Sequence, residues 1–158
     1  MPSSKAPEKG KEPAVKALFN VKDHEIGESA ESGVWIEIKD PDSGKPVGLE
    51  ILVYGEESSH VRKARNRVAN KLQFNQRRGG RRKASYDDVI ETDMILAIGA
   101  SGDWRAKTTD GDYVHQCPDG DDLLPFNNQN ARRVYEKCSF IPLQVLDAME
   151  DRANFTQK

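Results

Sequence analysis

GVWIEIKDPDSGKPVGLEILVYG, residues 33–55, has the pattern of a β-hairpin. Its first half alternates apolar and polar side chains with a period of two, so Val34, Ile36 and Ile38 share one face of a strand. The Asp40–Gly44 segment predicts a turn, because proline presets φ, aspartate binds nearby backbone amides and glycine accepts a positive φ. Residues 49–54 predict the return strand. Two strands alone are only marginally stable in water, so we expect this hairpin to pack against the rest of the chain.

Two helices are predicted to follow the hairpin. In residues 58–77, apolar side chains recur at helical spacing and form one stripe, made by Val61, Ala64, Val68 and Leu72. Ser58 or Ser59 can cap the first turn, since a serine oxygen accepts hydrogen bonds from the free backbone amides there. Residues 85–98 predict the second helix. Its C-terminal half is almost wholly apolar, so we expect that half at the centre of the core.

Residues 127–155 predict a pair of helices at the C-terminal end. Asn127 can cap the first helix, and Pro142 suits the first turn of the second, where the missing N–H leaves no hydrogen bond unmade. Apolar residues at helical spacing predict the inner face of the second helix, namely Leu143, Leu146, Met149 and Ala153, with Val145 beside them.

The remaining segments carry weaker patterns. Residues 1–16 hold mostly Lys, Glu, Pro, Ser and Gly, so we expect a disordered tail. Residues 17–21 are expected to add a third strand. Residues 99–125 are rich in Gly and Asp and predict a long acidic loop. The chain is therefore expected to be a single α+β domain over residues 17–155, in which an N-terminal β-hairpin or small antiparallel sheet (17–55) packs on about four helices.

The charge distribution is uneven, although the formal net charge is only −2. Ten basic residues and no acidic one lie between Arg62 and Lys83, whereas both flanking segments are acidic. Such a band suits three kinds of partner: the chain's own carboxylates, an acidic protein surface, or nucleic acid. Aromatic residues barely interleave with the band, and no helix-turn-helix or zinc-finger spacing accompanies it. Acidic protein surfaces are therefore favoured over nucleic acid.

The residue types that catalysis or metal binding needs are not grouped. His115 and Cys117 stand two apart, but no second pair of ligands completes a zinc set. The three histidines are scattered, and neither GxSxG nor GxxxxGK[ST] occurs, so nothing favours an enzyme. No apolar run approaches the ~20 residues of a membrane span, and no apolar core of a signal peptide is visible. We expect an intracellular protein without a membrane partner, in which Cys117 and Cys138 are free thiols.

Four segments follow one another in a particular order over about residues 17–155. They are the hairpin, the basic helix RKARNRVANKLQ, the acidic-to-apolar helix DDVIETDMILAIGASGDW, and the close LPFNNQNARRVYEKCSFIPLQVLDAMEDRANF. The most specific parts are Pro125-Phe126, Asn130-Ala131, Tyr135 and residues 151–155. In this order the chain resembles the tail assembly chaperones of long non-contractile-tailed bacteriophages, a family also described as minor tail or tail assembly proteins. One departure is the length of residues 99–124, whose Asp-rich part looks inserted.

The resemblance implies a role without catalysis or cofactor. Members bind the tape measure protein, keep its long hydrophobic helices soluble and recruit tail tube subunits in the host cell cytoplasm, and they are absent from the finished virion. From the residues we expect two contact surfaces. Acidic partners would meet the basic helix at Arg62, Arg65, Arg67 and Lys71. Apolar partner helices would meet Phe140, Ile141, Leu143, Val145 and Leu146, a set that fits an ordinary core equally well. Self-association, a nucleic-acid-binding accessory role of residues 62–83 and a structural place at a virion joint remain as alternatives.

Overall fold

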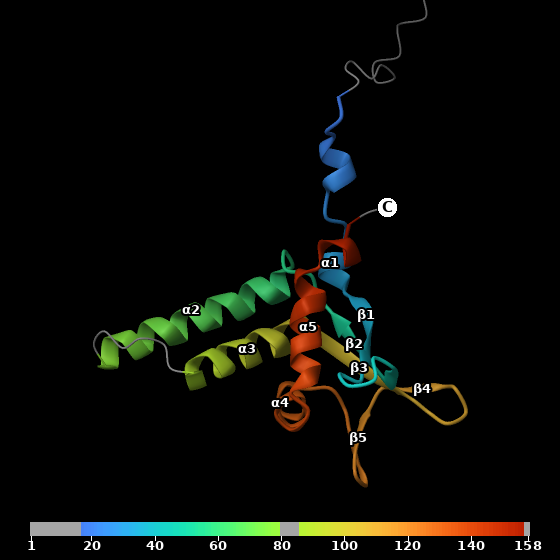
Figure 1. Cartoon of the computed structure of the whole chain (residues 1–158). Helices are drawn as coiled ribbons and strands as arrows, with labels where there is room; N and C mark the ends of the chain where they lie inside the picture. The colour runs from blue at the N-terminus through green and yellow to red at the C-terminus, as the bar shows by residue number, and fades with distance from the viewer. Residues whose placement is uncertain (1–16, 80–85, 157–158) are drawn as a thin grey trace, which may run out of the picture.

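The computed structural model describes residues 17–79 and 86–156, so the predicted tail of residues 1–16 lies outside the described part. Runs of strands and runs of helices follow one another along the chain in an α+β arrangement, as the sequence predicts (Figure 1). In chain order the elements are η1 (Val21–His24), α1 (Ser29–Ser32), β1 (Val34–Lys39), β2 (Pro46–Val53), α2 (Ser59–Gly79), α3 (Tyr86–Ala100), β3 (Ser101–Lys107), β4 (Tyr113–Val114), β5 (Cys117–Asp119), β6 (Asp122–Leu124), α4 (Asn128–Lys137), α5 (Phe140–Glu150) and η2 (Arg152–Asn154).

An antiparallel sheet in the order β1-β2-β3-β4 forms one layer of the domain. Its register places Ile36, Ile51 and Trp104 side by side on three neighbouring strands. Ile51 and Trp104 are fully buried, and Ile36 packs against the same core. The predicted hairpin is therefore confirmed, and the face that the period-two pattern marks as apolar is the one that meets the core.

The turn between β1 and β2 forms as its residue types predict. The Asp40 carboxylate accepts hydrogen bonds from the N–H groups of Asp42 at 2.8 Å and Ser43 at 3.1 Å. Gly44 has a φ of +70°, a value that favours glycine. These two backbone hydrogen bonds hold the pKa of the Asp40 carboxyl below its usual value, with the Ser43 N–H contributing most.

Residues 99–125 are not the long loop that the sequence predicts. They contain β3, which lies inside the main sheet, and the short hairpin of β5 and β6. The sequence SGDWRAK of β3 has weak strand propensity because it contains Gly and Asp. It becomes a strand because β2 offers a row of backbone groups to pair with and because Trp104 fills the core, where its Nε1 donates to the Leu124 carbonyl at 2.9 Å. The strand predicted over residues 17–21 is also absent from the structure, where η1 begins at Val21.

Helices α2 and α3 run side by side in opposite directions and extend together beyond the sheet (Figure 1). The predicted stripe on α2 is confirmed at its start, because Val61 and Ala64 are fully buried. Ser58 accepts a hydrogen bond from the Val61 N–H at 3.2 Å and so caps the helix, as predicted. The two helices approach closely at Gly99, where an added Cβ would lie 2.3 Å from the Ala64 Cβ.

Helices α4 and α5 complete the predicted C-terminal pair. Asn127 caps α4, with its side-chain oxygen accepting from the Asn130 N–H at 2.7 Å. Helix α5 packs on β1 and β2. Its Gln144 side chain binds both backbone groups of Lys39, accepting from the N–H at 2.9 Å and donating to the carbonyl at 2.7 Å. This double contact ties the outer edge of β1 to the middle of α5.

The inner face of α5 agrees with the predicted one at Val145 and Met149 and differs from it at Leu143. Ile141, Val145 and Met149 are buried in the core, whereas Leu143 is 59% exposed. Apolar side chains occur nearly all around the first turns of α5, so helical spacing alone does not distinguish the face that meets the sheet.

Candidate functional site

The four predicted basic contact residues lie on the exposed surface of α2. Arg62, Arg65, Arg67 and Lys71 are all exposed. Two of them meet the chain's own carboxylates: Arg65 Nη2 lies 2.6 Å from Glu56, and Lys71 Nζ lies 3.2 Å from Glu91. Part of the positive charge of the basic helix is therefore paired with the chain's own carboxylates. These carboxylates are one of the three kinds of partner that the sequence left open. The rest of the band, residues 77–83, lies outside the described side chains.

The five predicted apolar contact residues separate into three groups. Ile141 is 3% exposed and Val145 is fully buried, so both belong to the core, and their assignment to a contact surface is wrong. Phe140 and Leu146 are half-buried and pack against the core. Only Leu143 projects into solvent to a large extent.

A groove lies between α3 and α5 and encloses about 470 Å³. We call it the α3–α5 groove. Apolar side chains make up most of its lining, and the α4 helix and the link that follows it close one side. The residues that line it are Tyr86, Val89, Ile90, Asp93 and Met94 from α3, and Tyr135, Glu136, Ser139, Pro142, Leu143 and Leu146 from the C-terminal pair.

Both banks of the groove expose large apolar side chains. On α3, Tyr86 is 80%, Val89 50% and Ile90 46% exposed, and Leu143 faces them from α5 at 59%. Contiguous exposed apolar residues are uncommon on a monomeric protein and mark surfaces that bind other proteins. A groove between two helices is also the usual receptor for an amphipathic helix. The arrangement therefore suits binding of an apolar helical face.

The sequence did not single out the α3 bank of this groove. Val89 and Ile90 belong to the predicted helix 85–98, of which the C-terminal half was expected at the centre of the core, and neither residue was assigned to a contact surface. In the structure only the C-terminal half of α3 is buried, at Met94, Ala97 and Ile98. The signal that could have separated the halves is the run of acidic residues at the start of the helix, because a helix turn carrying several carboxylates stays in water.

The floor of the groove is fixed by a buried hydroxyl pair. Tyr135 is fully buried, and its hydroxyl lies 2.7 Å from the Ser101 hydroxyl, which also donates to the Ala97 carbonyl at 2.7 Å. Burial raises the pKa of the Tyr135 phenol well above its usual value, so it stays neutral. The pair joins α4 to the junction of α3 and β3 and holds the floor of the groove in place.

Glu91 connects three helices behind the groove. Its carboxylate accepts two hydrogen bonds from Arg132 of α4, at 2.9 and 3.0 Å, and one from Lys71 of α2 at 3.2 Å. The hydrogen bonds from Arg132 lower the pKa of the Glu91 carboxyl most, and Lys71 lowers it further. This fork-shaped contact is the strongest kind of arginine–carboxylate pair, so it fixes α4 relative to α3.

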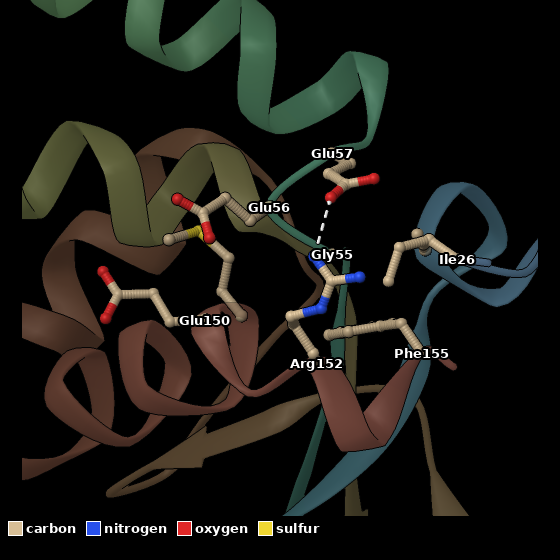
Figure 2. A pocket seen from close by; sticks show the side chains of 9 residues that line it. Ile26, Gly55, Glu56, Glu57, Glu150, Arg152 and Phe155 are labelled. Carbon is tan, nitrogen blue, oxygen red and sulfur yellow. Dashed lines mark hydrogen bonds and ion pairs between the residues drawn. The ribbon is translucent and has the colours of Figure 1, made fainter. Parts of the chain in front are cut away.

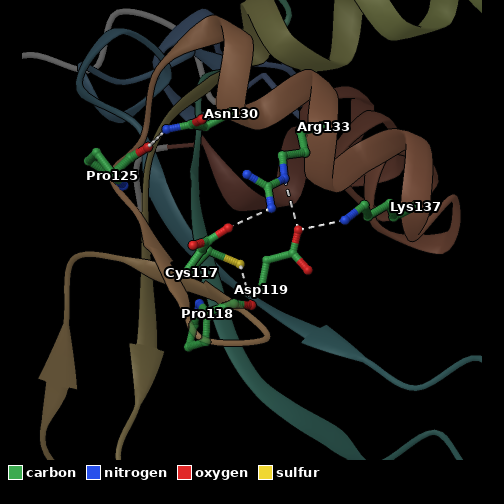
Figure 3. Close-up of polar contacts among 8 residues, drawn as sticks. Cys117, Pro118, Asp119, Pro125, Asn130, Arg133 and Lys137 are labelled. Atoms are coloured by element: carbon green, nitrogen blue, oxygen red, sulfur yellow. Dashed lines mark hydrogen bonds and ion pairs between the residues drawn. The ribbon is translucent and has the colours of Figure 1, made fainter.

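The other two cations of α4 are held by the β5–β6 hairpin (Figure 3). Asp119 lies 2.7 Å from Lys137 and 2.9 Å from Arg133, which also binds Asp122 at 3.0 Å. Lys137 lowers the pKa of the Asp119 carboxyl most. The acidic residues that sequence reasoning assigned to a loop therefore serve to pair the basic face of α4.

The face of the sheet away from the helices carries a second cluster that the sequence did not indicate. The Arg105 guanidinium stacks 4.1 Å from the centre of the Trp35 ring and 4.5 Å from that of Tyr113. Arg105 also pairs with Glu50, which accepts a hydrogen bond from the Tyr113 hydroxyl at 3.3 Å. The Arg105 cation therefore contacts two aromatic rings and one carboxylate within this cluster.

Side chains that bind metal ions are not grouped in the described part of the chain. Among residues 17–79 and 86–156, no three His, Cys, Asp or Glu side chains gather closely enough to hold a metal ion. Cys117 and Cys138 are free, and burial raises the pKa of the Cys117 thiol to about 11, so it stays protonated and unreactive near neutral pH. Figure 2 shows a pocket beside Gly55 where Arg152 binds Glu57 at 3.4 Å, but the pocket encloses only about 30 Å³, room for about one water molecule.

No known protein family, no curated protein and no solved structure matches the chain. No helix in the described part of the chain is both long enough and apolar enough to cross a membrane.

Proposed function

We propose that this protein is a bacteriophage tail assembly chaperone that acts by binding other proteins and catalyses no reaction. It works in the host cell cytoplasm, where it binds helices of the tape measure protein and recruits tail tube subunits. Two independent arguments support this proposal: the ordered segments of the sequence that resemble such chaperones, and the geometry of the α3–α5 groove.

The exposed apolar lining of the α3–α5 groove carries the proposal. A chaperone for long hydrophobic helices needs a surface that replaces water along one face of a helix. Tyr86, Ile90 and Leu143 supply such a surface from two helices that the core holds in place. Burying one such side chain against a partner removes apolar area from water, which stabilises the complex by about 1.5–3 kcal/mol for each fully covered side chain.

Helix α2, which packs against α3, offers a second candidate contact surface on its exposed basic face. Lys63 and Arg67 are exposed, and neither lies within ion-pair distance of a carboxylate in the described part of the chain. We assign this face to acidic surfaces of partner proteins, because exposed cations steer and orient oppositely charged partners.

The same uncommitted cations are the observation that favours a second candidate, a nucleic-acid-binding accessory protein. Binding of phosphates would be lost steeply as salt is raised, because each neutralised phosphate releases counterions. A gel-shift titration at low and moderate salt separates the candidates: tight, salt-sensitive binding favours the accessory protein, and weak binding at all salt concentrations favours the chaperone. A third candidate function is that of a structural component of a virion joint. It requires that the protein be detected in purified virions.

Co-expression with the tape measure protein tests the proposed function. We expect the chain to raise the soluble yield of the tape measure protein and to co-purify with it. Leu143→Asp should abolish both effects, because it places a charge in the apolar lining of the groove. The matched control is Leu123→Asp on β6, where the side chain is similarly exposed at 57% and lies outside the groove. Unchanged solubility with the parent chain, or equal loss with both variants, contradicts the proposal.

A further inference from the structure

The charged side chains that line the α3–α5 groove in the described part of the chain are of one sign. Asp93 and Glu136 are the two acids, and the described residues of the lining include no Lys, Arg or His. Asp93 is exposed and has no cation within ion-pair distance in the described part of the chain. Glu136 lies 3.7 Å from Arg132. Both terminal nitrogens of that guanidinium already donate hydrogen bonds to Glu91. The apolar groove therefore has an acidic rim.

Among the described residues, only one cation reaches this rim: Arg132, which lies 3.7 Å from Glu136. Arg132 binds Glu91, and Arg133 and Lys137 bind the carboxylates of the β5–β6 hairpin. Two more exposed acids stand beside the groove residues in sequence: Asp87 follows Tyr86 on α3, and Asp147 lies one turn after Leu143 on α5. An occupant that brings carboxylates would meet this negative rim unfavourably, whereas cations would be attracted.

From these contacts we infer that the α3–α5 groove takes an amphipathic helix whose apolar stripe is flanked by Lys or Arg. The inference rests on the proposed function in one respect, that the groove receives a helix from another protein. The two banks suit a helix because Tyr86, Ile90 and Met94 repeat every four residues along α3, the spacing of ridges that pack into a neighbouring helix. The apolar floor supplies affinity, and the acidic rim selects among helices by charge.

The expected size of the selection follows from the exposure of the rim. An exposed ion pair changes an affinity by about 1.5- to 5-fold. Two such contacts, at Asp93 and Glu136, give roughly tenfold tighter binding of a helix with cationic flanks. Because the rim is in water, added salt should reduce this preference.

Two synthetic helical peptides test the inference against the full chain. They share one leucine stripe and differ only in flanking residues, Lys in one and Glu in the other, and their binding is measured by fluorescence anisotropy at low and high salt. We expect the Lys peptide to bind roughly tenfold more tightly at low salt and the preference to shrink at high salt. The double variant Asp93→Lys/Glu136→Lys should reverse the preference, and Leu143→Asp should weaken both peptides.

A control with the same change in net charge separates the rim from bulk attraction. Asp110→Lys/Asp121→Lys replaces two exposed acids outside the groove and should leave the preference unchanged. Equal affinity for both peptides, or a preference that this control removes as effectively as the rim variant, overturns the inference. A dimer in light scattering that Arg67→Glu breaks apart also overturns it, because the groove would then hold the basic α2 of a second copy.

The two proposals can fail separately. If the Lys peptide binds with the expected preference but the tape measure protein does not co-purify, the inference stands and the proposed function fails. If the tape measure protein co-purifies while the peptides show no charge preference, the proposed function stands and the inference fails.

Discussion

Replacing Gly99 with alanine tests the close contact on which the α2–α3 pair depends. The added Cβ would lie 2.3 Å from the Ala64 Cβ, whereas two carbon atoms in contact lie about 3.5–4.0 Å apart. The helices would therefore have to separate by more than about 1 Å at this point. Neither group can rotate away, because a Cβ is fixed to its backbone.

The magnitude follows from two opposing effects. Overpacking in a well-packed core costs about 1–3 kcal/mol, and a fixed contact as short as this one belongs at the upper end. Alanine is a better helix former than glycine by about 0.8–1.0 kcal/mol. We expect Gly99→Ala to lower the free energy of unfolding by about 2 kcal/mol, which corresponds to a fall in Tm of about 4–8 °C for a chain of this size.

Urea unfolding followed by far-UV circular dichroism measures this change, and a double-mutant cycle isolates its cause. Ala64→Gly removes the opposing Cβ, so the double variant should be more stable than the sum of the two single effects predicts, by about 1 kcal/mol or more. If Gly99→Ala is as stable as the parent chain, or if the two effects simply add, the close approach of α2 and α3 is refuted.

Two further predictions concern the polar contacts behind the groove. Tyr135→Phe should lower the free energy of unfolding by about 0.5–1.5 kcal/mol in urea unfolding, because the Ser101 hydroxyl loses one partner but keeps the Ala97 carbonyl; an unchanged midpoint contradicts this. Glu91→Gln should cost about 1 kcal/mol at neutral pH, since its pairs are partly exposed. The folded-state pKa of Glu91 is lowered, so its contribution is present above the unfolded pKa of about 4.3 and is lost as pH falls through the folded pKa. The stability difference between parent and variant should therefore vanish in acid, and a difference that stays constant with pH contradicts this origin.

Local sequence patterns were sufficient to predict the elements whose structure depends on residues adjacent in sequence. The period-two alternation of residues 33–38 predicted β1, and Asp40 with Gly44 predicted its turn, because these features need only adjacent residues. The caps at Ser58 and Asn127 were predicted for the same reason. The α+β class follows from these elements.

Long-range contacts produced what the local patterns missed. Strand β3 was predicted as loop because its own residues favour a strand weakly, and its strand structure comes from pairing with β2, some 50 positions earlier in the chain. The acids of the β5–β6 hairpin were expected in a long acidic loop. They are ion-paired because the fold brings α4 beside them.

Helix α5 shows which features the sequence determined and which the tertiary structure decided. The sequence by itself determined that residues 140–150 form an apolar helix. It did not determine that Ile141 and Val145 enter the core while Leu143 stays in water. Apolar residues occur all around the first turns of α5, so the helical spacing does not indicate which face is buried. The packing of α5 on β1 and β2 made that choice, and with it decided that Leu143 faces Ile90 across the α3–α5 groove.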